Sequence, residues 1–351
     1  MNILIVGAGV AGLGIGWRLV QAGVSVTILE RDEPAQAATF AAAGMIAATA
    51  ELADAPEAEI AFATRARALW PGFAAELEAA TGIPIGYRRN GALLVEAARP
   101  ASLAPGTVWL EGAEVRRRVP LLGDVAGAVW APDEAMADNR ALGRALAAVF
   151  TAAGGRLMTG TEVTAVAPGA VTTAAGRHEA DMVILAAGAW SGRVLERARV
   201  TPVKGQVIAL APPPGVALPG PVIWGNGVYL VPRPHPGGQD QLMVGATVEQ
   251  AGFDLGLTPA ARESLRQRAE GLAPALTDWT LADHWAGLRP GSPDGLPLLG
   301  PLAAKEEKSL FVASGQYRNG ILFAPVIAEH VRDLVLGRTQ PVPAFDPRRF
   351  G

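Results

Sequence analysis

The stretch of sequence that decides the fold is residues 2–30, which read NILIVGAGVAGLGIGWRLVQAGVSVTILE. It opens with an apolar run over residues 2–6, which is typical of a buried strand and ends in glycines. Residues 10–22 have helical character, Gly23 is a plausible stop, and residues 24–29 form a second apolar run. The stretch therefore predicts a strand, a helix and a second strand at the start of an α/β domain.

The turn between the first strand and the helix reads Gly7-Ala8-Gly9-Val10-Ala11-Gly12. Gly7 permits the tight turn, Gly9 lets the backbone approach a pyrophosphate, and Gly12 lets the helix pack closely on the strand. The N-terminus of the helix then offers N–H groups to phosphates. Glu30 ends the second strand, where a carboxylate binds ribose hydroxyls. A tight turn without a ligand uses the same glycines, but these features together favour a dinucleotide, which can be NAD or FAD.

Composition and charge exclude several classes of protein. The chain has 351 residues, 50% of them hydrophobic, which is enough for two domains with large buried cores. A net charge of −3 gives no basic surface for nucleic acid. The chain has no cysteine, which excludes a disulfide scaffold, a thiolate metal site and a cysteine nucleophile, and which fits a reducing cytoplasm. The chain has no uninterrupted run of about 18 apolar residues, so the sequence predicts no membrane span.

The remainder of the chain alternates between a nucleotide-type pattern and a β-rich pattern. Helices are expected over residues 57–80, 139–153, 259–271 and 320–336, the second of them capped by Asp138. Strands are expected over residues 85–87 and 92–95, around a turn at Asn90-Gly91, and over 156–158, 162–166, 170–173, 182–186, 279–288 and 310–313. From residue 201 to 246 the β-runs are separated by Pro and Gly. Because the nucleotide-type segments stand at the start, middle and end, we expect a discontinuous two-domain protein.

Four further segments resemble the D-amino acid oxidase superfamily of flavoenzymes, and within it the glycine oxidase branch linked to thiamine biosynthesis. They are Ala41-Ala42-Ala43-Gly44-Met45-Ile46, Ala186-Ala187-Gly188-Ala189-Trp190-Ser191, Gly287-Leu288-Arg289-Pro290 with Asp294-Gly295-Leu296-Pro297, and Gly315-Gln316-Tyr317-Arg318-Asn319-Gly320-Ile321. The resemblance spans nearly the whole chain, and its last two segments are the most specific. It implies an α/β plus α+β fold of the glutathione reductase and D-amino acid oxidase type. A Rossmann-like FAD-binding domain would cover residues 1–80, 138–200 and 286–351, and a β-rich substrate domain residues 81–137 and 201–285.

The resemblance also assigns residues to FAD. Small residues over 41–44 would let the backbone pass against the flat isoalloxazine ring, although a flexible Ala-rich loop has the same composition. Gly320 is expected to open the final helix and to direct its N-terminal dipole at the flavin. The implied FAD contacts are Gly7, Gly9, Val10, Ala11, Gly12, Glu30, Arg31, Ala42, Ala43, Gly44, Met45, Val163, Ala187, Gly188, Trp190, Arg289, Gly315, Arg318, Asn319, Gly320 and Ile321.

The mode of FAD attachment can be judged from two residue types. Relatives with covalent FAD hold it through a cysteine or through a histidine early in the chain. This chain has no cysteine, and its first histidine is His178. We therefore expect noncovalent FAD.

Three residues are expected to act on the substrate. Arg289 matches the arginine that binds the substrate carboxylate in the glycine oxidase branch, and a planar guanidinium suits this task because it can bind both oxygens. Tyr229 matches the tyrosine that adds a hydroxyl to the same carboxylate, although a β-sheet core aromatic is the other interpretation. Arg318 either closes the pocket on the carboxylate or forms a salt bridge within the FAD-binding domain. The chain departs from the family at Gln316, where histidine is frequent, and at Gly227, where relatives often have a polar side chain.

The reaction that the resemblance implies is oxidative deamination of glycine, a small D-amino acid or N-methylglycine. Hydride leaves the substrate Cα for flavin N5, and water hydrolyses the resulting imine to an oxoacid and ammonia or an amine. The reduced FAD passes its electrons to molecular oxygen, which gives hydrogen peroxide. A D-amino acid or secondary-amine dehydrogenase, which uses a quinone or an electron-transfer protein, needs nearly the same residues. A noncatalytic flavin-binding protein is a third interpretation, against which Arg289 and Tyr229 argue. No Asp, Glu or His cluster has metal-ligand spacing, and self-association as a homo-oligomer is left open.

Overall fold

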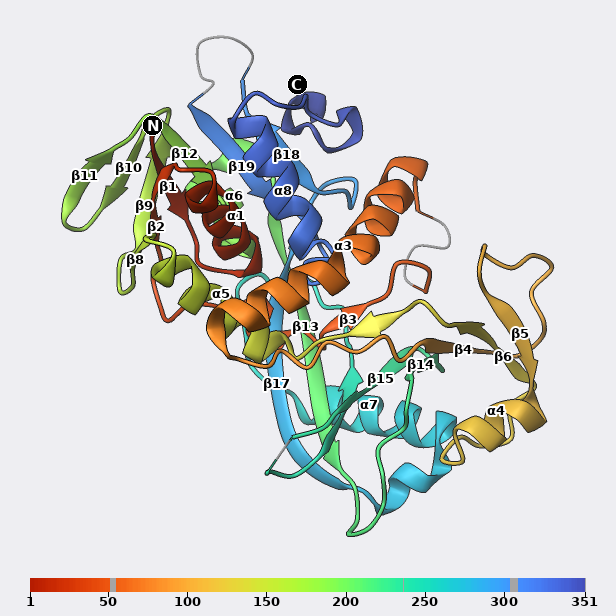
Figure 1. Cartoon of the computed structure of the whole chain (residues 1–351). Coiled ribbons are helices and arrows are strands. Elements are labelled where there is room, and N and C mark those ends of the chain that lie inside the picture. Colours follow the sequence, from red (N-terminus) through yellow and green to blue (C-terminus); the bar gives the residue numbers. More distant parts are fainter. Residues whose placement is uncertain (51–54, 236, 304–308, 351) are drawn as a thin grey trace.

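The structure is a computed structural model, and it describes residues 1–50, 55–235, 237–303 and 309–350 (Figure 1). A six-stranded sheet with the order β18-β19-β12-β1-β2-β8 contains strands from both ends of the chain. Its strands are parallel except β18, which is antiparallel to β19. They are β1 (Asn2–Val6), β2 (Ser25–Leu29), β8 (Arg156–Met158), β12 (Met182–Leu185), β18 (Leu298–Pro301) and β19 (Leu310–Ser314).

Four helices pack together beside this sheet and build the largest apolar core. They are α1 (Val10–Gln21), α3 (Glu57–Thr81), α5 (Asn139–Ala152) and α8 (Ala324–Val335). Asp138 caps α5 as expected, because its carboxylate accepts hydrogen bonds from the N–H groups of Arg140 at 2.8 Å and Ala141 at 3.0 Å. No helix in the described ranges is both long and apolar enough to cross a membrane.

The second large sheet has eight strands in the order β17-β13-β16-β15-β14-β4-β6-β5. Its strands are β4 (Ala92–Glu96), β5 (Val108–Glu111), β6 (Gly127–Ala131), β13 (Thr201–Ala211), β14 (Val222–Gly225), β15 (Val228–Arg233), β16 (Gln241–Gly245) and β17 (Thr280–Gly291). Helix α7 (Pro259–Leu272) packs on β13, β15 and β16. The long strands β13 and β17 reach from this sheet to the nucleotide-type half of the molecule, where they contact the 3-10 turn η1 (Gly188–Trp190) (Figure 1).

The remaining elements are short. They are β3 (Met45–Ile46) paired with β7 (Ala135–Met136), a three-stranded sheet of β9 (Val163–Ala167), β10 (Ala170–Thr173) and β11 (Gly176–Glu179), and the helices α2 (Ala38–Ala41), α4 (Gly112–Arg118) and α6 (Ser191–Val194). Further 3-10 turns are η2 (Glu196–Ala198), η3 (Pro274–Asp278), η4 (Pro343–Phe345) and η5 (Pro347–Phe350).

The expected combination of a Rossmann-like sheet with a β-rich second half is confirmed. The residue limits of the two domains stay a prediction. The expected hairpin around Asn90-Gly91 was wrong. Residues 85–87 form no strand, Arg88 forms an isolated bridge with Met136, and β4 pairs with β6 and β14 instead. The reason is tertiary, because the N–H of Ile85 donates to Glu78 Oε1 at 2.7 Å and its carbonyl accepts from the N–H of Asp138 at 2.7 Å, so neither group bonds to β4.

Candidate active site

A cavity of about 1280 Å³ lies between the two large sheets. Its walls come from segments far apart in the sequence: the glycine turn, the end of β2, residues 41–45, the turn after β12, β15, the segment after β16, β17 and residues 316–322. Small-molecule sites usually have volumes of about 300–1000 Å³, so this cavity has room for a large cofactor together with a small substrate.

The glycine turn has the geometry that its sequence predicts. Gly7 has φ +103°, and a Cβ there would lie 2.6 Å from the carbonyl oxygen of Ala186. A Cβ at Gly12 would overlap the carbonyl of Gly7, so this glycine allows α1 to pack against β1. Glu30 folds back onto the turn, where its Oε2 accepts from the N–H of Ala8 at 2.6 Å.

One side-chain contact at this turn was missed by the sequence interpretation. Thr39 Oγ1 accepts a hydrogen bond from the N–H of Val10 at 3.0 Å, at the start of α1. Gly9, Val10 and Ala11 all line the cavity there. Thr39 lies 29 residues from Val10, outside any local motif, and no sequence signal pointed to it.

Residues 41–45 form a fixed wall, which argues against the interpretation as a flexible loop. The carbonyl of Ala41 accepts from Trp285 Nε1 at 3.1 Å, and the carbonyl of Ala43 accepts from Arg233 Nη2 at 3.0 Å. Gly44 has φ +86°, and a Cβ there would overlap the carbonyl of Ala137. The small residues are therefore required by close backbone packing as well as by the cavity.

Arg233 is a buried cation that the sequence interpretation also missed. It is 2% exposed, and burial lowers the pKa of its guanidinium to about 10. Besides Ala43, its Nη2 donates to Asn139 Oδ1, and the Asn139 side chain in turn donates to the carbonyl of Thr39 at 2.6 Å. A lone arginine within the apolar run of β15 was the available signal, because such a residue is rarely buried without a partner.

The expected opening of the final helix at Gly320 was wrong. Helix α8 begins at Ala324, and Gly320 lies in the preceding turn, in which the N–H of Phe323 donates to the carbonyl of Asn319 at 2.8 Å. Pro325 explains the later start, because proline fits only the first turn of a helix and cannot donate a backbone hydrogen bond. Gly320 still lines the cavity, but the dipole argument does not apply to a helix that starts four residues later.

Asn319 is held by a buried carboxyl group. Its Nδ2 donates to Glu59 Oε1 of α3 at 3.2 Å, and both residues are less than 9% exposed. Burial raises the pKa of Glu59, and the hydrogen bond from Asn319 opposes only part of that rise. The contact fixes the turn over residues 316–320 against α3.

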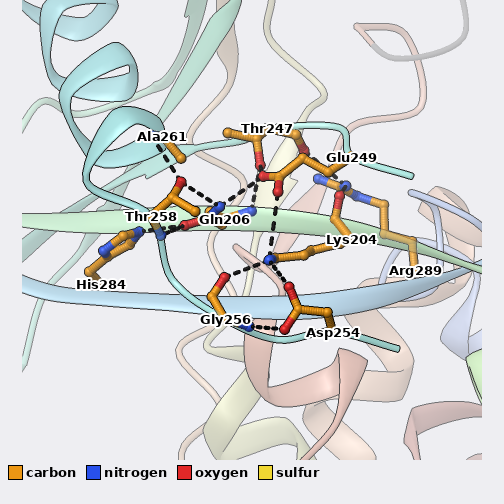
Figure 2. Close-up of polar contacts among 10 residues, drawn as sticks. All are labelled: Lys204, Gln206, Thr247, Glu249, Asp254, Gly256, Thr258, Ala261, His284 and Arg289. Carbon is orange, nitrogen blue, oxygen red and sulfur yellow. Dashed lines mark hydrogen bonds and ion pairs between the residues drawn. The ribbon is translucent and has the colours of Figure 1, made fainter. Parts of the chain in front are cut away.

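Arg289 lies on β17 opposite Val203 of β13. Its Nη1 donates to the carbonyl of Thr247 at 3.1 Å and to the carbonyl of Lys204 at 3.4 Å (Figure 2). Its guanidinium lies against Gly205, where a Cβ would overlap it. The side chain is partly buried and lines the cavity. Its Nε and Nη2 make no hydrogen bond to other residues of the described ranges.

Tyr229 and Arg289 contact residues that lie only two positions apart in the chain. Tyr229 pairs with Gly245 at the end of β16, and a Cβ at Gly245 would overlap its hydroxyl. Thr247, two residues further on, is the acceptor for Arg289. Tyr229 also packs edge-on against Trp224, with ring centroids 6.4 Å apart. The structure therefore brings Tyr229 and Arg289 to one wall of the cavity.

The two positions where the chain departs from the family both lie at the cavity. Gln316 is 6% exposed, and its Nε2 has no partner among the described residues. Gly227 has φ +72° and precedes Tyr229 in the cavity wall. Arg318 is exposed, with its guanidinium 5.1 Å from the ring centroid of Tyr317, and it forms no ion pair within the described part of the chain. Its expected role stays a prediction.

Most of the residues expected at the site do line one cavity, although lining is not binding. Those that line it are Gly7, Gly9, Val10, Ala11, Glu30, Arg31, Ala42, Ala43, Gly44, Met45, Val163, Ala187, Gly188, Trp190, Tyr229, Arg289, Arg318, Asn319, Gly320 and Ile321. Gly12 and Gly315 do not line it. Gly315 has φ +78° and forms the turn that leads to Gln316. Arg31 stacks on Trp190, 4.8 Å from its ring centroid.

The family is decided by a sequence match over nearly the whole chain. A family model described as DAO, FAD dependent oxidoreductase, matches residues 2–334. The chain belongs to this family.

Relatives of the DAO family include proteins of two lengths. The bifunctional protein ThiO/ThiG of Synechocystis sp. is 40% identical over 364 residues, which cover 99% of this chain and 54% of that protein. The chain spans about half the length of the bifunctional relatives that it matches. Glycine oxidase of Geobacillus kaustophilus is 33% identical over 357 residues, covering 95% of this chain and 92% of that protein.

Solved structures of the DAO family confirm the fold. The crystal structure of the Geobacillus kaustophilus glycine oxidase has a TM-score of 0.88 at 32% identity, covering 99% of this chain and 97% of the other. Iminodiacetate oxidase from Chelativorans sp. has a TM-score of 0.86 at 27% identity, covering 98% of each chain.

The cavity fits the cofactor of the DAO family. Gly9 and Ala11 line the cavity at the N-terminus of α1, where their N–H groups would bind a pyrophosphate, while the Val10 N–H is already bonded to Thr39 Oγ1. Glu30 stands where a ribose diol would donate hydrogen bonds. The small residues over 42–44 leave a bare backbone in another part of the cavity wall. These residues would hold the adenosine diphosphate and the isoalloxazine parts of FAD, respectively.

None of the four histidines, His178, His235, His284 and His330, lines the cavity. His330 is buried in α8, where burial lowers its pKa. His284 Nε2 lies 3.0 Å from Gln206 Oε1, in the polar cluster beside Arg289 (Figure 2). Within the described ranges, no group of three His, Cys, Asp or Glu residues could hold a metal ion.

Proposed function

We propose that the chain is an FAD-dependent amino acid oxidase that acts on glycine, a small D-amino acid or N-methylglycine. Its FAD is noncovalent and its electron acceptor is molecular oxygen. The observation that carries this proposal is the placement of Arg289. A guanidinium held against a bare backbone at a cavity wall, with Nη1 bonded to two carbonyls, retains donors for a substrate carboxylate.

The residues of the chain would act by orienting the substrate. Arg289 binds the carboxylate, and the Tyr229 hydroxyl at the same wall adds a second donor. A fixed carboxylate sets the position of Cα, so most of the rate gain comes from positioning and electrostatics. FAD, when bound, supplies the acceptor for the hydride that leaves Cα. The amine must be neutral, and no side-chain base is required of the protein.

The relatives support this substrate class. One is named a glycine oxidase and another an iminodiacetate oxidase, and both of these substrates carry a carboxylate beside an amine. We further propose a role in forming the thiazole of thiamine, which the fused ThiO/ThiG relatives support. A strain without the gene should then need an external thiazole source for growth, and normal growth without one would contradict this role.

Flavin reduction tests the activity without assuming the acceptor. The FAD-loaded protein is mixed anaerobically with glycine, N-methylglycine or D-alanine, and separately with methylamine and ethylamine. We expect the amino acids to bleach the flavin and the amines to do so poorly. Oxygen consumption and hydrogen peroxide formation with excess substrate then identify an oxidase. A flavin that amino acids reduce but oxygen does not reoxidise would indicate a dehydrogenase.

A further inference from the structure

Lys204 is a charged side chain in an otherwise buried stretch of β13. Its side chain is 2% exposed, and a buried ammonium is stable only when its donors are paired. Lys204 Nζ lies 2.5 Å from the carbonyl oxygen of Gly256, 3.2 Å from Asp254 Oδ2 and 3.7 Å from Glu249 Oε2 (Figure 2). All three acceptors belong to residues 247–258, which connect β16 to α7 and which we call the 247–258 segment.

Gln206 supports the same segment from two positions further along β13. Its Nε2 donates to Glu249 Oε1 at 2.9 Å, and its Oε1 accepts from the N–H of Thr258 at 3.0 Å. Thr258 also caps α7, so the end of the segment is fixed to both elements. Backbone bonds in both directions join Lys204 to Glu249, at 2.9 and 3.0 Å. Two buried polar side chains of one strand thus hold a segment that has no regular structure of its own.

The 247–258 segment reaches the substrate side of the cavity. Thr247, Val248 and Leu255 line the cavity. The carbonyl of Thr247 is the nearer of the two acceptors that hold Arg289 Nη1, at 3.1 Å. The orientation of the guanidinium therefore depends on where the segment places one carbonyl oxygen.

We propose that Lys204 is a positioning residue for the substrate carboxylate: it holds the 247–258 segment so that the Thr247 carbonyl orients Arg289. This inference rests on the proposed role of Arg289 as the carboxylate-binding residue. Lysine suits the task because a compact ammonium has three donors that can diverge to three acceptors, whereas a guanidinium is a planar fork.

The charges on the segment agree with this arrangement. The backbone N–H of Gly256 and the charge of Lys204 lower the pKa of Asp254. Burial alone would raise the pKa of Glu249, but hydrogen bonds from Thr247 and Gln206, together with Lys204, lower it. Both carboxylates are therefore ionised where they face the ammonium.

The experiment compares four FAD-loaded proteins: the wild type, Lys204→Met, Asp254→Asn and the control Gln250→Ala. Asp254→Asn guards against a folding defect in Lys204→Met, since the Asp254 side chain is 66% exposed and its replacement buries nothing. Gln250 is exposed on the same segment, and its side chain makes no hydrogen bond with described residues. The first measurement is chymotrypsin cleavage of the native protein after Phe253, Leu255 or Leu257, which are 38%, 46% and 47% exposed.

The second measurement is the affinity of each protein for acetate and for methylamine, with the flavin absorbance as the signal of binding. We expect Lys204→Met, and more weakly Asp254→Asn, to be cleaved faster and to bind acetate roughly tenfold less tightly, the loss expected for one charge-assisted contact. Methylamine affinity and the limiting rate of flavin reduction at saturating glycine should change much less. The control should match the wild type in both measurements.

Three results would overturn the inference while the proposed function stands. If Lys204→Met has unchanged acetate affinity and is cleaved no faster than the wild type, Lys204 does not hold the 247–258 segment. Faster cleavage with unchanged acetate affinity would show that the segment does not orient Arg289. An equal loss of acetate and methylamine affinity would indicate a general structural role. A wild-type protein that binds no acetate would refute the proposed function itself, and the inference with it.

Discussion

The guanidinium of Arg289 lies against the bare backbone of Gly205, in a space that any side chain at Gly205 would fill. The two residues stand on neighbouring strands, β17 and β13, and both line the cavity. The Arg289 side chain therefore requires glycine at position 205 because of the space that it occupies, and not because of the backbone conformation of Gly205.

Gly205→Ala should displace the Arg289 guanidinium without removing it. We expect kcat/KM for amino acids to fall by roughly tenfold to 100-fold, because small errors in substrate position are costly. FAD content should be unchanged. Gly220→Ala is the matched control, since a Cβ there meets no atom within 4 Å. Normal amino acid turnover by Gly205→Ala would show that the guanidinium has other places to lie.

Glu30→Ala should weaken FAD binding without changing the preferred substrate. The carboxylate would bind the ribose, and it also accepts from the N–H of Ala8 in the glycine turn. Since a hydrogen bond to a charged group contributes about 1.5–3 kcal/mol, the Kd for FAD should rise roughly tenfold or more. Titration of the apoprotein with FAD measures this. An altered substrate preference at normal FAD affinity would show that Glu30 acts elsewhere.

Glu59→Gln should stabilise the apoprotein in a pH-dependent way. Burial raises the folded-state pKa of Glu59, so the stability that the neutral carboxyl gives is present below the unfolded pKa and is lost as pH rises through the folded pKa. Glutamine keeps an oxygen acceptor for Asn319 and has no charge to bury. We expect a higher Tm than the wild type at about pH 7, and a difference that vanishes toward about pH 4. A difference that does not depend on pH would contradict the assignment.

Acid precipitation of the purified protein should release all of its flavin as FAD. The chain has no cysteine to attach the cofactor, and its first histidine, His178, comes late in the sequence. The supernatant is analysed for FAD, and the pellet for residual flavin absorbance. Flavin that stays with the denatured chain would refute noncovalent binding, and release of FMN or NAD would refute the cofactor.

The sequence was most informative where chemistry is local. The turn at Gly7 and Gly12 and the cap at Asp138 were predicted because each depends on neighbouring residues. The start of α8 was misplaced at Gly320, because Pro325 fits only the first turn of a helix and the helix therefore begins at Ala324.

Long-range contacts account for the rest. Glu59 and Asn319 are 260 residues apart, and Lys204 and Asp254 are 50 apart, with Asp254 in a segment without periodicity. Neither pair belongs to a motif, so only the fold reveals that these polar residues are partners. A charged residue in the apolar strand β15 indicates that Arg233 has a partner, but the sequence does not indicate that this partner is the carbonyl of Ala43.

The central claim is that Arg289 binds the substrate carboxylate, and Arg289→Lys tests it most directly. Lysine keeps the charge but loses the planar pair of donors. The measurement is anaerobic flavin reduction by glycine and by methylamine in the wild type and the variant. We predict that kcat/KM for glycine falls by roughly 10- to 100-fold, as a loss of about 1.5–3 kcal/mol implies, while methylamine stays equally poor in both proteins and FAD content is unchanged. Normal reduction by glycine in the variant, or equal losses for glycine and methylamine, would contradict the claim.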